Sequence, residues 1–496
     1  METAPDLHAQ RPPLDHVKIR RIIIGIMLAM FLGALDQTIV TTALPTIGRE
    51  MADAGDIAWV VTAYLLCSTA VTPLYGKLSD IHGRRTMLLI AITVFVAGSI
   101  ACALAGDMLT LILMRGLQGL GGGGLISLSQ TIIADIVSPK ERSRYQGYIA
   151  GMFGVASVGG PVLGGLMAEH LHWTMIFWIN LPLGILAFAM TDRVLRQLPR
   201  HDRRRRIDYL GALLMVVAAT SLLLALTWGG VAFPWGSPRI LGLLGLSALF
   251  WTVFIWRIAS VEEPFLPLSI LLNPVVRRAI AAAFFAMGTM ISLCLFLPIY
   301  IETVLGHSAS TSGLMLIAFM GGTPFGAMIC GRAMSRMRYY KRPSMAGLAL
   351  SVAMIALLAA FPRGFGDIGF MALLALAGAG IGTALPLTTV SIQNAVPIAQ
   401  MGTATGAMNF FRALGSALIV SAMSAVFFAA LGDGAPTGGQ SIEMLATQLS
   451  GRGGDLAHVF TLVFGAAALG LAAALGFVVA MEAKPLRTSV EPSPAE

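Results

Sequence analysis

The chain has 496 residues, of which 56% are hydrophobic and 12% are charged, and its formal net charge is +8. Soluble domains carry about 25% charged residues, so this composition excludes a soluble globular protein and indicates an integral membrane protein. The apolar runs are too long for the strands of a membrane barrel, which leaves an all-α polytopic fold.

Fourteen apolar stretches are long enough to cross a bilayer as helices. The first contains an aspartate, Asp36, and follows a polar tail, which favours a retained first helix over a cleaved signal peptide. The predicted spans are 22–44, 57–76, 86–105, 109–137, 145–169, 173–191, 208–229, 239–258, 279–301, 312–330, 345–362, 368–392, 403–431 and 457–481.

The distribution of basic residues gives the orientation of these spans. With the N-terminus in the cytoplasm, 27 of the 33 Lys and Arg residues fall in cytoplasmic segments and only four fall outside. The sequence therefore predicts a multi-pass protein of the inner or plasma membrane with both termini cytoplasmic. The run Arg203-Arg204-Arg205-Arg206 is interpreted as a topology signal or an anionic-lipid contact rather than a nucleic-acid site.

Two parts of the chain resemble each other weakly. A shift of 259 residues aligns the fourth span with the twelfth, so that Gly119 falls on Gly378, and Gly76 has an echo in Gly331. Chance matches in a glycine-rich chain are the alternative explanation. We expect two six-helix bundles with spans 7 and 8 inserted between them, which is a transporter architecture. The predicted segments are a cytoplasmic N-tail (1–21), a first bundle (22–191), a basic loop with two inserted helices and a linker (192–278), a second bundle (279–481) and a cytoplasmic C-tail (482–496).

Asp36 and Arg115 are charged residues inside apolar spans. A charge in hydrocarbon costs about 2.5–3.5 kcal/mol on insertion scales, so such residues are interpreted as functional. At about 1.5 Å per residue, Asp36 lies about 21 Å from the cytoplasmic face of a core of roughly 30 Å, and Arg115 about 9 Å from the outer face. The two lie at nearly the same level, so we predict an ion pair. An acid that gains and loses an arginine partner would take up and release a proton, whereas a static structural pair is the alternative.

The stretch from Gly76 to Arg85 joins spans 2 and 3 on the cytoplasmic side. Gly76 and Gly83 allow a tight turn, and Asp80 can pair with a cation or lie at a helix N-terminus. Arg84 and Arg85 can bind a carboxylate or a helix C-terminus of a neighbour. We predict a conformational latch that breaks and re-forms as the two halves move, with a plain basic loop as the alternative.

Two other motifs interrupt apolar spans. Span 5 contains Gly160-Pro161-Val162-Leu163-Gly164-Gly165, in which proline breaks the helical hydrogen bonding and the glycines admit a close neighbour. This motif is interpreted as a gating bend, with a passive packing kink as the alternative. In span 13, Asn409 and Arg412 form a second polar patch that is a candidate for lining a cavity.

The sequence contains no signature of a nucleotide, metal or catalytic site. No G-x-x-x-x-G-K-[ST] occurs, and the four cysteines fall in apolar spans without metal-ligand spacing. Gly119-x-Gly121-x-x-Gly124 lies in an apolar helix without a preceding strand, so it indicates helix packing rather than a Rossmann fold. We therefore expect no cofactor, no metal and no enzymatic activity.

These motifs together resemble the major facilitator superfamily, specifically its fourteen-span drug:proton antiporter family of the EmrB/QacA type. The resemblance covers nearly the whole chain. Thr41, Ile81 and Ala156 depart from the family pattern, which usually has an asparagine, a basic residue and a glycine at these places. The matching stretches are Leu35-Asp36-Gln37-Thr38 with Ala43-Leu44-Pro45, Gly76 to Arg85 with Leu88, Arg115 with Gln118, Gly119 and Gly121, Gly160 to Gly165, His172-Trp173, and Asn180-Leu181-Pro182-Leu183-Gly184.

The resemblance implies export of amphipathic, often cationic, organic compounds in exchange for protons. By this resemblance Asp36 carries the proton or senses a cationic substrate, and Arg115 and Gln118 tune it. The expected partners are a small-molecule substrate, protons and membrane lipids, without nucleic acid, and a periplasmic adaptor is left open. A same-fold, proton-coupled transporter of a metabolite, siderophore or lipid is the alternative, and a membrane sensor or enzyme has little support.

Overall fold

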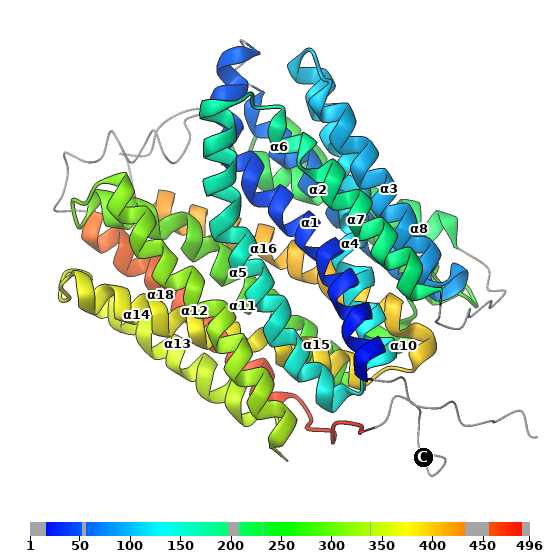
Figure 1. Cartoon of the computed structure of the whole chain (residues 1–496). Coiled ribbons are helices and arrows are strands. Elements are labelled where there is room, and N and C mark those ends of the chain that lie inside the picture. The colour runs from blue at the N-terminus through cyan, green and yellow to red at the C-terminus, as the bar shows by residue number, and fades with distance from the viewer. Residues whose placement is uncertain are drawn as a thin grey trace, which may run out of the picture.

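The computed structural model describes residues 16–51, 56–196, 208–230, 232–337, 339–431 and 456–488, which are mostly helical. The arginine run 203–206 lies outside these residues, as do most of the predicted N-tail and the loop before the last span. Figure 1 shows long helices running in alternating directions.

The described part of the chain has fourteen spans long and apolar enough to cross a membrane, which confirms the predicted number. The sixth span consists of α6 and α7, and the twelfth consists of α14 and α15. The helices are α1 (His16–Glu50), α2 (Ile57–His82), α3 (Arg84–Ala103), α4 (Met108–Ile136), α5 (Pro139–His170), α6 (Met175–Trp178), α7 (Asn180–Leu195), α8 (Tyr209–Trp228), α9 (Pro238–Ser260), α10 (Leu268–Leu271), α11 (Pro274–Thr303), α12 (Ala309–Arg336), α13 (Arg342–Ala360), α14 (Asp367–Gly382), α15 (Ala384–Asn394), η1 (Ile398–Gln400), α16 (Met401–Leu431) and α18 (Leu456–Ala480).

Short polar residues, prolines and one glycine mark the turns between these helices. Asp107 and Ser138 accept hydrogen bonds from backbone N–H groups in the first turns of α4 and α5, and Asn273 does the same at the start of α11. Gly83, between α2 and α3, has a φ of +88°, a conformation that favours glycine. These local signals explain why the helices begin where they do.

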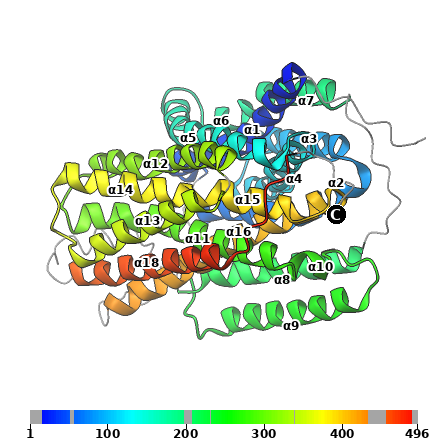
Figure 2. The same ribbon diagram turned by 90° about the horizontal axis from the view of Figure 1, so that it is seen from below.

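The helices form two bundles and an attached pair. In the first bundle α1 packs against α5 and α7, and α4 packs against α2 and α3; in the second, α12 packs against α14, and α11 and α13 pack against α18. The pair α8 and α9 pack on each other, and α8 also contacts α2 and α16. Figure 2 shows this pair together along the lower edge of the molecule. The arrangement is the predicted one of two six-helix bundles with two inserted helices.

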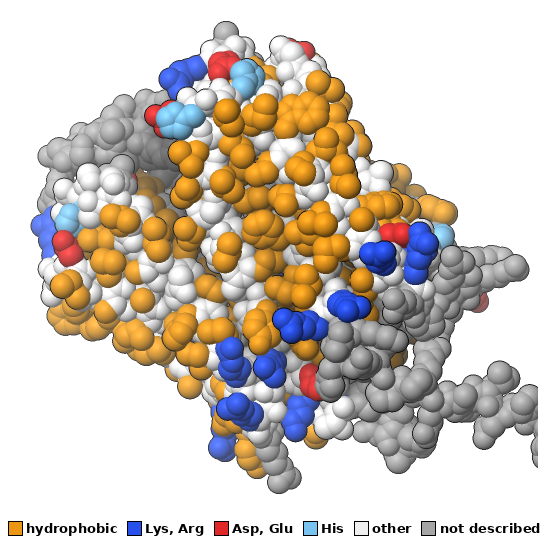
Figure 3. Space-filling model, in the orientation of Figure 1, with side chains coloured by type: hydrophobic (Ala, Val, Ile, Leu, Met, Phe, Trp, Pro, Cys, Tyr) orange, Lys and Arg blue, Asp and Glu red, His pale blue; other side chains and the backbone are white. Residues whose placement is uncertain are grey.

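Basic side chains collect at one end of the spans. In Figure 3 hydrophobic side chains cover the middle of the visible face, and Lys and Arg gather along its lower edge. We call this edge the basic end. It holds the start of α1, the turn between α2 and α3, and the start of α5. The sequence predicts this end to be cytoplasmic.

The two bundles meet at the basic end through small residues. A Cβ at Gly76 of α2 would lie 2.3 Å from the carbonyl oxygen of Gly402 of α16, and one at Gly331 of α12 would lie 2.2 Å from the carbonyl oxygen of Ser143 of α5. Gly331 is the predicted counterpart of Gly76, and Gly402 follows Ser143 by 259 residues. The same close contact is thus made twice, which agrees with the predicted repeat.

Candidate functional site

Asp36 and Arg115 form the buried ion pair that the sequence predicts. Arg115 Nη1 of α4 donates to Asp36 Oδ2 of α1 over 2.7 Å, and the side chains are 1% and 0% exposed. Because neither group reaches solvent, the charge of each depends on the other.

Two amides complete the surroundings of the carboxylate. Gln118 Nε2 and Asn180 Nδ2 donate to Asp36 Oδ1 over 2.8 and 3.0 Å. Asn180 at the start of α7 also donates to Ser99 Oγ of α3, and Ser99 donates to the carbonyl oxygen of Phe177. The carboxylate therefore accepts from three side chains, and α1, α3, α4 and α7 are tied together through it.

Arg115 is held by further contacts within the same bundle. Its Nε donates to the carbonyl oxygen of Val60 over 3.0 Å, and Nη1 donates to Gln118 Oε1 over 2.6 Å. The guanidinium carbon lies 4.4 Å from the ring centroid of Tyr64 and 5.8 Å from that of Phe177. Such cation–π contacts favour the charged arginine in an apolar setting.

The glycines of the span-5 motif pack against α1 next to this site. A Cβ at Gly160 would lie 2.0 Å from Thr38 Oγ1, and one at Gly164 would lie 2.4 Å from the carbonyl oxygen of Ile39. Thr38 Oγ1 also donates to the carbonyl oxygen of Ala156 over 2.9 Å. The α5 helix continues through Pro161 from Pro139 to His170.

Gly165 differs from these two glycines. A Cβ there would meet nothing within 4 Å, so this position of the predicted motif does not contact α1. The close approach of α1 to α5 thus depends on Gly160 and Gly164.

The predicted latch residues form ion pairs at the basic end. Arg84 Nε donates to Asp135 Oδ2 over 2.7 Å and its Nη1 donates to Asp80 Oδ1 over 2.5 Å, while Arg85 pairs with Asp192. These contacts join the turn after α2 to α4 and α7 within the first bundle.

Asp80 connects this network to the second bundle. Its carboxylate accepts from the backbone N–H groups of Gly402 and Thr403 over 3.0 and 2.8 Å, and from Thr403 Oγ1 over 2.6 Å. It lies at the N-terminus of α16, where a negative charge is favoured by the helix dipole. The sequence prediction that Asp80 pairs with a cation or lies at a helix N-terminus is confirmed, because Asp80 does both.

A second chain of polar contacts links the bundles. Arg142 Nη1 of α5 donates to Gln393 Oε1 of α15 over 3.1 Å, and Gln393 Nε2 donates to the carbonyl oxygen of Gln130 and to Thr405 Oγ1 over 3.4 and 3.2 Å. Asn409 Nδ2 of α16 donates to Gln130 Oε1 of α4 over 2.9 Å. This chain extends from the basic end toward the middle of the membrane spans.

The candidate residues thus fall into separate groups. Asp36, Arg115 and Gln118 form one cluster, and Asn409 and Arg412 form a patch between the bundles. No hydrogen bond or ion pair within the described ranges joins the patch to Asp36. Sequence reasoning assigned no role to Asn180, Ser99 or Tyr64, although a polar asparagine inside an apolar span was a usable signal.

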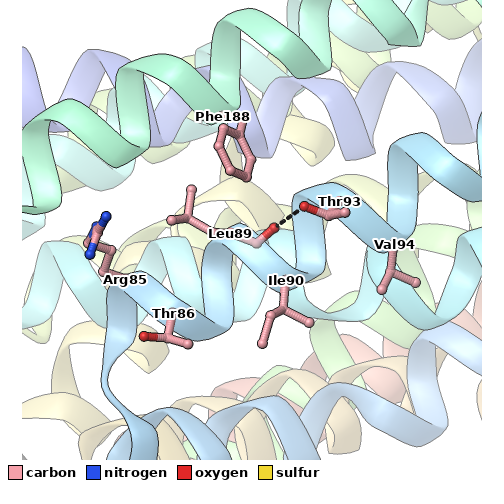
Figure 4. A pocket seen from close by; sticks show the side chains of 7 residues that line it. All are labelled: Arg85, Thr86, Leu89, Ile90, Thr93, Val94 and Phe188. Atoms are coloured by element: carbon pink, nitrogen blue, oxygen red, sulfur yellow. Dashed lines mark hydrogen bonds between the residues drawn. The ribbon is translucent and has the colours of Figure 1, made fainter.

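An apolar surface groove lies between α3 and α7, away from the Asp36 cluster. Figure 4 shows Phe188 of α7 facing Leu89 of α3, with Arg85 at one end of the groove. None of the residues that bind Asp36 lines it. In the described part of the chain, no three His, Cys, Asp or Glu side chains come together in a way that could hold a metal ion.

Residues 26–420 match the family described as Major Facilitator Superfamily. The chain belongs to the major facilitator superfamily. The residues of the buried Asp36 cluster all lie within the matched part of the chain. A bacterial homologue of the iron transporter ferroportin shares the fold, with a TM-score of 0.62 and 12% identity over 92% of this chain and 98% of that chain.

Relatives of this chain include proteins named as drug transporters. The multidrug transporter protein MdtP of Bacillus subtilis is 33% identical over 412 residues, which cover 83% of this chain and 76% of that protein. An uncharacterized MFS-type transporter of Mycobacterium tuberculosis is 34% identical over 426 residues, which cover 86% of this chain and 62% of that relative. The chain thus spans less than two thirds of the mycobacterial relative's length.

Proposed function

We propose that this protein exports amphipathic organic compounds from the cytoplasm in exchange for protons, with the Asp36–Arg115 pair as the coupling site. The observation that carries the proposal is a fully buried carboxylate that accepts from an arginine and two amides. Relatives named multidrug transporter and efflux pump support an organic substrate and the outward direction.

A change in the charge of Asp36 would act directly on Arg115, because the two groups are in contact. Protonation of the carboxylate would weaken its bond to Arg115, while Arg115 would keep its contacts with Val60, Gln118 and the Tyr64 ring. Both charge states therefore retain partners for the arginine. Moving one net charge across 100 mV supplies about 2.3 kcal/mol, and a pH gradient adds to this.

The contacts between the bundles favour an arrangement closed at the basic end. Asp80 on Gly402 and Thr403, and Arg142 on Gln393, join the two bundles there. With the basic end in the cytoplasm, this arrangement is closed on the cytoplasmic side. A proton from the outer side would then neutralise Asp36 after substrate release, before the latch opens.

The test is transport by the purified protein in liposomes with an imposed pH gradient. We expect accumulation of cationic, neutral or anionic amphipathic dyes only while the gradient lasts, and collapse when a protonophore is added. Asp36→Asn should abolish gradient-driven accumulation, and Asp107→Asn, at an exposed helix cap, should not. Coupled accumulation by Asp36→Asn at the wild-type rate would remove the proposed role of Asp36.

The same assay separates the alternative substrate classes. If no dye moves while the pH gradient holds, transport of a specific metabolite, siderophore or lipid becomes the better explanation. Drug susceptibility of a strain lacking the gene provides an independent check, because loss of a multidrug exporter sensitises cells to several unrelated compounds.

A further inference from the structure

Three charged residues lie deep in the described membrane spans. These are Asp36, Arg115 and Arg412, and every other charged residue of these spans lies within six residues of a helix end. Asp36 and Arg115 neutralise each other. Arg412, eleven residues after Met401, is thus a deep cation that forms no ion pair with any described carboxylate.

The hydrogen bonds of Arg412 leave donors free. Nη1 donates to Asn409 Oδ1 over 3.3 Å, and Nη2 lies 3.4 Å from Thr389 Oγ1 and 3.7 Å from Met408 Sδ. The Nε–H is buried and has no acceptor among the described residues. A guanidinium has five N–H donors, and neutral partners at these distances satisfy them weakly.

Arg412 lies on a polar stripe of α16. Thr405, Asn409, Arg412 and Ser416 follow one another at helical spacing, so they share one face. Thr405 is buried, whereas the other three are partly exposed. Asn409 bonds Gln130 of the first bundle, so this face points toward that bundle.

The position of Arg412 along α16 places it beside the region between the bundles. It lies one turn farther from the basic end than the Asn409–Gln130 contact. The polar chain through Gln393 and Gln130 closes the basic-end side of this position. Arg412 therefore lies at the end of the closed contact that is farther from the basic end, and the residue as a whole is partly exposed while its Nε is buried.

We propose that Arg412 binds the negatively charged group of the substrate, so that the favoured substrates are amphipathic organic acids rather than cations. This inference rests on the proposed export function and names its substrate class. The planar guanidinium matches a carboxylate or sulfonate through paired N–H donors. A cationic compound would be repelled by Arg412, and Asp36 is already engaged by Arg115.

Three probes with one ring system test the charge preference: naphthylacetate, its neutral amide naphthylacetamide, and naphthylmethyltrimethylammonium. Binding to the purified full-length protein is measured by equilibrium dialysis, and transport in liposomes with an imposed pH gradient. Wild type should bind naphthylacetate about tenfold or more tightly than the amide, because one charge-assisted hydrogen bond changes the binding affinity by about that factor. It should bind the ammonium compound weakest. Preference for the ammonium compound, or equal affinity for all three, overturns the proposal.

Substitution of Arg412 assigns the preference to this residue. Arg412→Gln should weaken binding of naphthylacetate about tenfold to a hundredfold and leave binding of the amide within about twofold. Arg412→Lys should retain part of the preference, since lysine keeps the positive charge but lacks the paired N–H donors of the planar guanidinium. Arg336→Gln, the same change at an exposed helix end, is the control. Equal losses for the acid and the amide in Arg412→Gln would overturn the assignment.

The two proposals fail in different ways. If the acid binds selectively through Arg412 but no probe responds to the pH gradient, proton-coupled export is wrong while the anion site stands. If gradient-driven transport favours the ammonium probe, the export function stands and the anion site is wrong. Unfolding of Arg412→Gln leaves the wild-type preference as the deciding measurement.

Discussion

Removing the charge of Asp36 is expected to destabilise the first bundle. The carboxylate accepts from Arg115, Gln118 and Asn180, and both members of the ion pair are fully buried. Asp36→Asn leaves the guanidinium without its counter-charge, and breaking a buried pair from one side costs about 3–5 kcal/mol. Arg115→Gln leaves the carboxylate uncompensated and should cost a similar amount.

The double variant Asp36→Asn/Arg115→Gln removes both charges together. Its loss should be smaller than the sum of the two single losses by about 2–3 kcal/mol, because neither charge is left alone in the core. The free energy of unfolding is measured by denaturant titration in mixed micelles, followed by tryptophan fluorescence. Asp107→Asn is the matched control, since Asp107 is the N-cap of α4 and asparagine caps equally well. Strictly additive losses would refute the coupled pair.

Three other substitutions and one control test how the helices meet. Asp80→Asn removes the negative charge at the N-terminus of α16, which should weaken this contact by about 1 kcal/mol and lengthen spin-label distances between α2 and α16 at the basic end. Unchanged distances would contradict the latch. Gly76→Ala should separate α2 and α16 further at this end, because its Cβ would lie 2.3 Å from the carbonyl oxygen of Gly402. Double electron–electron resonance measures the spin-label distances in both variants. Gly164→Ala should slow transport by crowding α1, whereas Gly165→Ala, with nothing within 4 Å, should not; equal rates would reject this packing role.

Hydrophobicity and charge were sufficient to predict the fold. Membrane spans have no water to satisfy backbone groups, so length and apolarity alone define them, and all fourteen predicted spans are present. Breaks inside a span were not predicted: the chain divides the sixth span between Trp178 and Asn180 and the twelfth between Gly382 and Ala384. These interruptions are too short to change the hydropathy of the whole span.

The site could be predicted only in part, because position along a helix does not give the direction in which a side chain points. The depth calculation placed Asp36 and Arg115 at the same level of the membrane. Both residues could be identified because a charged side chain in hydrocarbon has a high free-energy cost. Asn180 and Ser99 carry no charge, so they gave a weaker signal.

The partners of the latch lie too far away in the sequence to be predicted. Asp135 is 51 residues from Arg84, Asp192 is 107 from Arg85, and Gly402 is 322 from Asp80. The sequence indicates that these groups need partners, but only the packing of the helices identifies them.

The placement of the ion pair constrains how coupling can work. Asp36, Arg115, Gln118 and Asn180 all belong to the first bundle, so rigid rocking of one bundle against the other leaves their contacts intact. The simple view that rocking alone separates the arginine from the acid is therefore insufficient, and we infer that α1 shifts within its own bundle.

The α5 helix is suited to drive such a shift. It contacts α1 through Gly160 and Gly164, and it contacts α12 of the second bundle through Ser143 and Gly147. The same helix therefore touches α1, which carries Asp36, and α12 of the second bundle. Small residues at both contacts keep the helices close without interlocking side chains, which permits sliding. On this argument the span-5 motif transmits movement between the latch and the acid, and its proline need not act as a gate.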